Sequence, residues 1–182
     1  MKRPNEIIAC DDFALRRWRA ASDIDSLFLM IEESLDHLRP WMPWIARHSR
    51  ETTRDFLADC DPKWQSGDSF NYAIVKDGTL VGSCSIYRAA EPRGRVMGYW
   101  LHAAATGQGI ATRAAAALAA EAFALPDVEY LEIAHDLANT ASGAVPRRLG
   151  FFEAGRKQVA PAAPSDTGTD VIWRLNRPDD RG

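Results

Sequence analysis

Apolar and polar positions follow two different periods along the chain, and the period first changes near its start. Residues 13–18 alternate between apolar and charged side chains, which predicts a strand. From Ser22 the apolar positions recur every three or four residues, and an acidic residue three positions on, Asp25, is typical of a helix start. The chain is therefore expected to open with a strand and then a helix, whose inner face is formed by Ile24, Leu27, Phe28, Ile31 and Leu35.

Two prolines and two tryptophans in residues 38–44 are expected to end this helix, because proline lacks the N–H that a helix interior requires. An irregular segment is therefore predicted there. A second helix is predicted from about Ser49 to Trp64, with Phe56 and Leu57 facing inward.

After the second helix the pattern has the period of strands. Residues 70–75 and 80–87 flank an Asp77-Gly78 pair, and such a pair accommodates the positive φ angles of a tight hairpin turn. A third apolar run covers residues 96–101. These three runs predict an antiparallel meander.

Residues 107–125 are rich in alanine and have no proline or glycine after Gly109, so they predict a helix. The fold class expected is α/β, with a mixed, mostly antiparallel central sheet, helices on both faces and the order β-α-α-β-β-β-α-β-α-β-β. The last elements of that order are a strand at 128–133, a short helix capped by Asn139 that ends near Leu149 and Gly150, and strands at 151–159 and 171–175 on either side of a loop at 160–169.

The composition favours one globular domain over residues 1–182, since 46% of the 182 residues are hydrophobic. A net charge of only −3 argues against nucleic acid or an anionic membrane as a partner. No apolar run has the character of a signal peptide or reaches the roughly 20 residues of a membrane span. A soluble, cytoplasmic protein is expected.

The cysteines and histidines do not suggest a metal site. Cys10, Cys60 and Cys84 are far apart and form no C-x-x-C pair, and the four histidines show no H-x-x-x-H spacing. Reduced thiols packed as small apolar groups are expected, and no metal is required.

The turn before the long helix carries the clearest chemical signal. Small residues there let the backbone approach a ligand, and the first N–H groups of a helix are free to bind an anion. A tight turn with no ligand is an alternative. A dinucleotide fingerprint would need Gly or Ala where Thr112 stands, and a P-loop would need Gly-Lys-Ser/Thr. An anion cradle is therefore expected on Gly107, Gln108, Gly109, Ile110, Ala111 and Thr112.

Four short motifs in order resemble the GNAT N-acetyltransferase superfamily, over nearly the whole chain. The tryptophan- and proline-containing segment at 38–44 resembles that of its ribosomal-protein N-terminal acetyltransferase branch. The four motifs are Gly98-Tyr99-Trp100-Leu101, Gly107-Gln108-Gly109-Ile110-Ala111-Thr112, Asn139-Thr140-Ala141-Ser142 and Leu149-Gly150-Phe151.

The resemblance implies an enzyme that transfers acetyl from acetyl-CoA to an uncharged primary amine in a ternary complex. It implies that pantetheine lies along Tyr99, Trp100 and Leu101, that the pyrophosphate lies on the amides of residues 107–112, and that Asn139 and Ser142 lie near the thiol. The acceptor implied is the N-terminal amine of a protein or peptide; an amine antibiotic or toxin is the alternative.

The chain departs from the family pattern at the phosphate turn. Thr106 stands where the family usually has Arg or Gln, so one charge-assisted contact to the phosphates is missing. Arg113, Arg147 and Arg148 are the nearest cations that could replace it.

The usual glutamate before Gly98, which takes the amine proton through water, is also missing, since Arg95, Val96 and Met97 occupy that stretch. Glu91, His102 and His135 are the substitute bases to consider, and orientation alone could supply much of the rate.

Ser142 is expected to help protonate the CoA thiolate or merely to support a helix start. Pro146 is expected to kink that short helix by removing the bond to the Ser142 carbonyl. Trp41 and Trp44 are either core residues or the wall of an acceptor groove, and the 160–169 loop is expected to lie over the same groove.

Two further interpretations stay open. The missing glutamate and Thr106 also fit a non-catalytic CoA-binding regulatory module, and a nicotinamide-dependent oxidoreductase is a more remote alternative. The sequence fits a monomer or a homodimer equally well.

Overall fold

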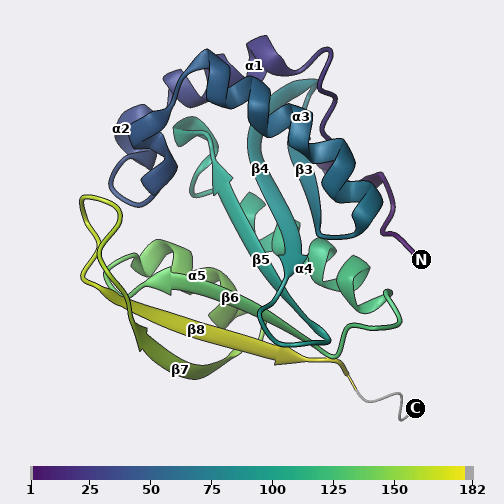
Figure 1. The fold of residues 1–182 in the computed structure, drawn as a ribbon, viewed down its shortest axis with the longest axis vertical. Helices are drawn as coiled ribbons and strands as arrows, with labels where there is room; N and C mark the ends of the chain where they lie inside the picture. Colours follow the sequence, from purple (N-terminus) through teal and green to yellow (C-terminus); the bar gives the residue numbers. More distant parts are fainter. Residues whose placement is uncertain (1, 179–182) are drawn as a thin grey trace.

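A computed structural model describes residues 2–178, and within them eight strands form one sheet in the order β1-β2-β3-β4-β5-β6-β8-β7 (Figure 1). Only the β5–β6 pair is parallel among these strands. The expected mixed, mostly antiparallel sheet is thus confirmed. The strands are β1 Ile7–Cys10, β2 Phe13–Arg17, β3 Ser69–Lys76, β4 Thr79–Arg88, β5 Gly94–Leu101, β6 Tyr130–Asp136, β7 Phe152–Gln158 and β8 Thr169–Asn176.

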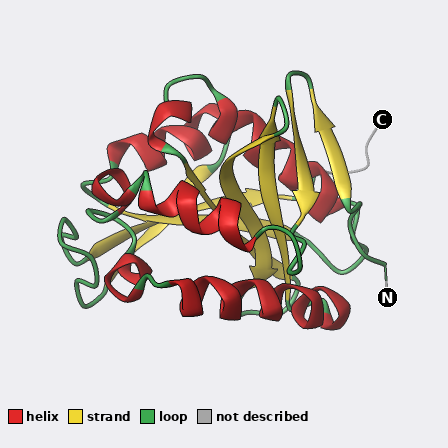
Figure 2. Cartoon of the chain, turned by 90° about the horizontal axis from the view of Figure 1, so that it is seen from above, coloured by secondary structure: helices red, strands yellow, loops and turns green. Residues whose placement is uncertain are grey.

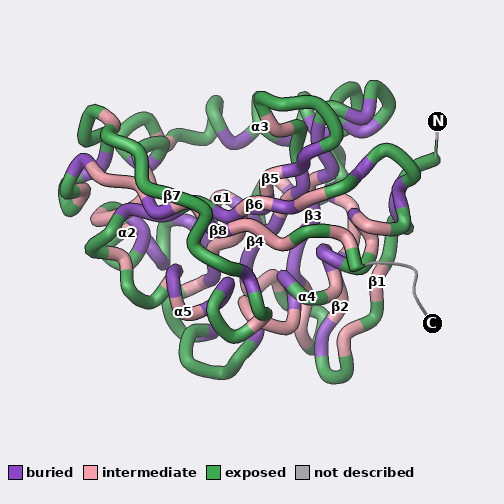
Figure 3. The backbone as a smooth tube through the Cα atoms, turned by 90° about the horizontal axis from the view of Figure 1, so that it is seen from below, coloured by how far each residue is buried: buried purple, intermediate pink, exposed green. Residues whose placement is uncertain are grey.

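Helices cover both faces of the sheet (Figure 2). One apolar core lies between the sheet and the helices α4 and α5, and a second lies beneath α1 and α3. Figure 3 shows buried segments concentrated along the central strands. The helices are α1 Ile24–Glu32, α2 Leu35–Leu38, α3 Arg50–Ser66, α4 Ile110–Phe123 and α5 Thr140–Arg148, with short 3₁₀ helices at Pro43–Arg47 and Ala103–Ala105.

The structure corrects three details of the expected order. Strand β1 was missed, because its residues are largely exposed and its turn to β2 uses Asp11 at a φ of 42° in place of glycine. The helix expected from Ser22 is interrupted and becomes α1 and α2. Leu57 is buried as expected, but Phe56 is 37% exposed and meets the edge of the Trp18 ring.

Other local predictions are confirmed. Asp77 and Gly78 have φ angles of 50° and 77°, as the tight hairpin turn requires. Helix α3 begins after Ser49, whose hydroxyl accepts from the Thr52 amide at 3.1 Å while the Thr52 hydroxyl accepts from the Ser49 amide at 3.0 Å. This reciprocal capping fixes where the second long helix starts.

The parallel strands β5 and β6 separate along their length. Their pairing covers Gly94 to Val96 of β5 and Tyr130 to Glu132 of β6, after which the strands diverge (Figure 1). β5 remains paired with β4, and β6 with β8. The divergence therefore opens the sheet at its centre.

A hydrogen bond between Tyr99 and the Ser142 carbonyl attaches helix α5 beside this opening, and Pro146 leaves that carbonyl free to accept it. Proline has no N–H to donate to the carbonyl of Ser142, as the sequence indicates. Tyr99 of β5 donates its hydroxyl to that carbonyl at 2.9 Å instead. The proline thus frees a helix acceptor that holds α5 against β5.

A second contact holds α5 against β6. The His135 ring lies against Gly143, where an added Cβ would be 2.5 Å from Nε2. The ring cannot easily withdraw, because Nε2 accepts from the Trp173 indole at 2.9 Å and Nδ1 lies 2.7 Å from the Asp136 carbonyl. Only glycine fits on the α5 side of this ring.

We expect Tyr99→Phe to lower the free energy of unfolding by about 1–3 kcal/mol, because it leaves the Ser142 carbonyl without its donor. Adding Pro146→Ala restores a backbone N–H, so the double variant should lose less than the sum of the two single variants. Denaturant unfolding measures all three. Tyr87→Phe is the matched control, since Tyr87 is 42% exposed and has no hydrogen-bond partner within residues 2–178; additive losses would contradict the pairing.

We expect Gly143→Ala to destabilise the fold by about 1–3 kcal/mol, because the new methyl group overlaps the His135 ring. Helix propensity alone would stabilise this variant by about 1 kcal/mol, so the sign of the change identifies the clash. The control is Gly155→Ala on β7, where an added Cβ meets nothing within 4 Å. A thermal melt in which both variants match the wild type would refute the contact.

Candidate active site

A cavity of about 1260 Å³ occupies the opening between β5 and β6. It is bordered by strand residues from Met97 and Ile133 onward, by the start of α5, and by the segment between α2 and α3. The cavity brings together seven of the expected site residues, namely Trp41, Trp44, Tyr99, Trp100, His135, Asn139 and Ser142. Leu101 is instead 8% exposed in the apolar core.

The turn at residues 106–112 has the geometry of an anion cradle beside the end of β5. Gly107 and Gly109 have φ angles of 74° and 73°, and α4 begins at Ile110 with no side-chain cap. The first helical bond runs from the Arg113 amide to the Gly109 carbonyl at 3.1 Å, so the preceding amides have no partner within the helix. Free amides at the positive end of a 14-residue helix favour an anion.

Lys76 is a cation beside this cradle that the sequence did not single out, and Arg113 also donates to the Gln108 carbonyl at 3.4 Å. The Lys76 ammonium donates to the Gln108 side chain at 3.3 Å and lies 2.9 Å from Asp12. The only clue was its place before the hairpin turn, because antiparallel pairing puts that turn at the edge where β5 ends.

Two of the three arginines proposed to replace the missing family cation have partners of their own. Arg113 contacts Asp12 and lies over the Phe13 ring, and Arg147 lies over the Trp173 ring. Hydrogen bonds from Arg113 and then Lys76 lower the pKa of Asp12 to about 2. Asp12 is therefore an ionised counter-ion for both cations.

The expected bases are not well placed. Both His135 nitrogens are bonded, as described above, and the ring is 8% exposed. His102 is likewise engaged, by the Ala104 amide at 3.1 Å and by Glu33 at 3.1 Å. Glu91 lies at the closed end of the strand pair, 3.5 Å from the Tyr130 hydroxyl, outside the cavity. This arrangement does not support any of the three as the base.

Tyr99 and Ser142 meet within the cavity. The two hydroxyl oxygens are 3.5 Å apart, and the Asn139 side chain accepts from the Ser142 amide at 3.1 Å, which caps α5 as expected. Burial raises the pKa of Tyr99 to about 12. Tyr99 is therefore a neutral hydrogen-bond donor, which can orient the serine but carries no charge.

Trp44 and the loop before β8 border the other part of the cavity. Trp44 is 39% exposed, and its ring lies 5.6 Å from that of Trp100. The Ser165 amide donates to the Pro40 carbonyl at 3.0 Å, so the loop lies against the tryptophan-containing segment as expected. Sequence reasoning missed the acidic residues that this side presents, Asp136, Asp166 and Asp170.

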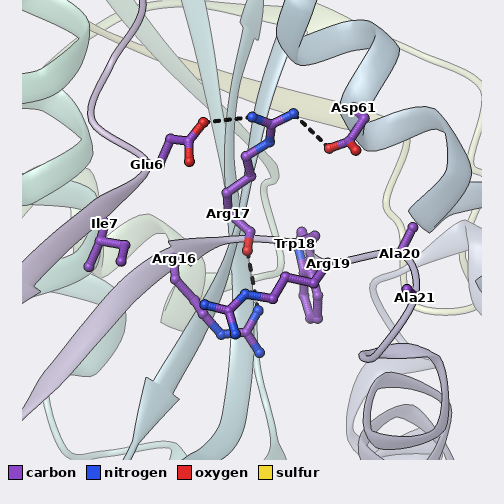
Figure 4. Close-up of a pocket in the computed structure, with 9 residues that line it drawn as sticks. All are labelled: Glu6, Ile7, Arg16, Arg17, Trp18, Arg19, Ala20, Ala21 and Asp61. Carbon is purple, nitrogen blue, oxygen red and sulfur yellow. Dashed lines mark hydrogen bonds and ion pairs between the residues drawn. The ribbon is translucent and has the colours of Figure 1, made fainter.

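A smaller cavity of about 500 Å³ lies near β1 and β2, away from the β5–β6 opening. Figure 4 shows Arg17 between Glu6 and Asp61, each 2.7 Å from it. Arg16 is paired with Asp23, also at 2.7 Å. Two of the three arginines of this smaller cavity are thus paired with carboxylates, so the larger cavity is the better candidate site.

No described helix is long and apolar enough to cross a membrane. Within residues 2–178, no group of three or more His, Cys, Asp and Glu side chains is placed to hold a metal ion.

Known proteins resemble this chain in both sequence and structure. "Putative ribosomal N-acetyltransferase YdaF" of Bacillus subtilis is 27% identical over 140 residues, which cover 74% of this chain and 75% of YdaF. RimL, a ribosomal L7/L12 α-N-protein acetyltransferase solved with coenzyme A, has a TM-score of 0.86 at 25% identity and covers 94% of this chain and 98% of its own.

The microcin C7 self-immunity acetyltransferase MccE, solved with acetyl-CoA and AMP, shares the fold with a TM-score of 0.83 at 21% identity, over 91% of this chain and 93% of its own. The sequence profile of the acetyltransferase (GNAT) domain matches residues 12–152. That match confirms the resemblance expected from the four motifs. The chain therefore belongs to the GNAT acetyltransferase family.

Proposed function

We propose that this enzyme transfers the acetyl group of acetyl-CoA to the N-terminal amine of a protein or peptide. The observation that carries the proposal is the single cavity that joins the β5–β6 opening to the wall containing Trp41 and Trp44. A site for acetyl-CoA alone would need only the part of the cavity between β5 and β6. The second part, which extends to Phe56 on α3, has room for an acceptor with several groups.

The cofactor's pantetheine arm lies along β5 in this proposal, and its pyrophosphate lies on the amides before Arg113. The fit is supported by the two glycines of the cradle, where an added Cβ would meet nothing within 4 Å. Lys76 supplies the charge that Thr106 cannot, since the Thr106 hydroxyl donates to the Ala103 carbonyl at 2.8 Å. Ser142 lies near the thiol and assists its protonation.

The acceptor assignment is supported by relatives such as RimL, a ribosomal L7/L12 α-N-protein acetyltransferase. MccE, a self-immunity enzyme, represents the alternative of a small amine-bearing toxin. The exposed tryptophan wall would suit either acceptor. Acceptor assays must therefore decide between them.

We expect the enzyme to release CoA thiol with peptides that have a free N-terminus. N-terminally blocked peptides of the same sequence, with or without an internal lysine, should give no release, because the proposed reaction takes place on the α-amine. Mass spectrometry should find one added acetyl group on the α-amine. Trp44→Ala should raise the KM for the peptide by roughly tenfold, the effect of about 1.4 kcal/mol, and leave the KM for acetyl-CoA unchanged.

Three results would contradict this assignment. Turnover of small amines but not peptides would favour the toxin alternative. A thermal shift with acetyl-CoA and no turnover of any amine would favour a binding module. A shift with NAD alone would indicate an oxidoreductase.

We expect Lys76→Met to raise the KM for acetyl-CoA by roughly fivefold with little change in kcat, because it removes about 1 kcal/mol of exposed charge attraction. Asp12→Asn frees both cations and should lower that KM. Lys63→Met is the matched control, since Lys63 pairs with Asp59 on α3, away from the cradle. An unchanged KM in Lys76→Met, at both low and high salt, would exclude Lys76 from phosphate binding.

A further inference from the structure

Three aspartates border the acceptor part of the cavity, and they differ in how they are bonded. Asp136 ends β6, Asp166 lies in the loop before β8, and Asp170 is the second residue of β8. Asp136 is 8% exposed and Asp170 is half-buried. None of the three aspartates belongs to the four family motifs of this chain.

Two of these carboxylates are hydrogen-bonded to backbone amides. Asp136 accepts from the Ala138 amide at 2.9 Å and from the Thr167 amide at 2.7 Å. Asp166 accepts from the Ala162 and Ala163 amides at 2.9 and 2.7 Å. Both therefore hold the loop in shape.

The third carboxylate, that of Asp170, has no hydrogen-bond or ion-pair partner anywhere in residues 2–178. Asp170 stands directly opposite Asp136 in the β6–β8 ladder. It therefore faces the cavity with both carboxylate oxygens available.

Strand alternation places Asp170 on the acceptor side of the sheet. His135, Val171 and Trp173 are buried toward α5, where Gly143 meets the His135 ring. Side chains one residue away on each strand point to the opposite face. Asp136 and Asp170 are such neighbours, and so they lie across the sheet from α5 and toward the segment that carries Trp41.

The environments of the opposed aspartates move their pKa values apart. Burial would raise the pKa of Asp136, but its bonds to Ala138 and Thr167 outweigh this and lower it. Burial raises the pKa of Asp170, and the charges of Asp136 and Asp166 raise it further, against smaller opposing effects of His135 and Lys157. A pair of carboxyls separated in this way is typical of an acid–base site.

We propose that Asp170 binds the ammonium form of the acceptor and takes its proton, as the general base that the missing family glutamate would have been. This inference rests on the proposed function, in that the acceptor is a primary amine. The unbonded oxygens of Asp170 are the docking point for the ammonium group, and the neighbouring carboxylate of Asp136, whose pKa is lowered, adds to the attraction for a cation.

Proton transfer from the acceptor precedes acyl transfer. The ammonium nitrogen gives one proton to the Asp170 carboxylate, which passes it to solvent. The free amine attacks the thioester carbonyl carbon, so that the N–C bond forms and the C–S bond breaks. The second proton lost from nitrogen is taken up by the departing sulfur, near Ser142, and CoA leaves as the thiol.

Other candidates for the general base fit the structure less well than Asp170. His48 lies 2.9 Å from Glu32 and stacks on Phe28, which places its ring beside α1. A metal-bound water is a further alternative, but the aspartates of this wall are not arranged as a metal site.

We expect Asp170→Asn to lower kcat by roughly 100-fold or more, the usual contribution of a general base, and to leave the KM for acetyl-CoA within about twofold. In the wild type, kcat/KM should fall as pH drops through the pKa of Asp170. The variant should lack that limb and rise steadily toward alkaline pH, as more of the amine is free. Asp170→Glu, which keeps a carboxylate, should restore the limb.

The stability of Asp170→Asn separates catalysis from structure. A carboxyl whose pKa is raised in the folded state destabilises the fold once it ionises, and this effect grows as pH rises through that pKa. The variant should therefore melt no lower than the wild type at pH 8. A structural role would give a lower melting temperature.

Asp55→Asn, an exposed substitution on α3 outside the cavity, is the control for loss of one charge and should leave turnover unchanged. Turnover is measured with two acceptors in separate assays, namely the peptide that gives the fastest CoA release and glycinamide. Turnover of glycinamide but not peptides would overturn the protein acceptor while still testing Asp170. Turnover by Asp170→Asn within about threefold of the wild type, with the same pH profile, would overturn the assignment of Asp170 as the general base. A wild type that acetylates neither amine would overturn it as well.

Discussion

The separation of β5 from β6 is the constraint on which the rest of the structure depends. Beyond Val96 and Glu132 the inner edges of both strands lack each other as hydrogen-bond partners, although each strand stays paired on its outer edge. Unmet backbone groups in a sheet interior are costly. A ligand with amide groups, such as a pantetheine arm, can meet them. The sheet therefore keeps an open centre whose backbone groups are available to a ligand.

Maintaining that opening requires contacts that do not close it, and α5 provides them from one side. Tyr99 holds the Ser142 carbonyl that Pro146 leaves free, and the His135 ring is wedged between Gly143 and Trp173. Each contact joins the helix to a different strand of the opening. The same residues thus set the spacing of the site and bring the Ser142 hydroxyl into it. For this reason His135 is better understood as a spacer than as a base.

Much of the fold was predictable because its signals are local. The Asp77-Gly78 turn, the helix start at Ser49 and the glycines before α4 each depend on a few neighbouring residues, and each was found where expected. Strand β1 was not predicted, because its residues are largely exposed and its turn uses Asp11 where a glycine would be expected. Lys76 was missed for another reason. Its place beside Gln108 depends on the pairing of three strands, which no short window of sequence contains.

The position of Asp170, the proposed general base, depends even more strongly on strand pairing. Asp136 and Asp170 face one another only because β8 pairs with β6 and leaves β7 at the edge of the sheet. A shift of one residue in that pairing would turn Asp170 to the α5 side, where Trp173 and Val171 are buried, and expose an apolar face to the acceptor. The apolar residues that α5 covers therefore fix the register, and the register in turn fixes which carboxylate meets the amine. In this family member the packing of one face of the sheet thus selects the chemistry of the other.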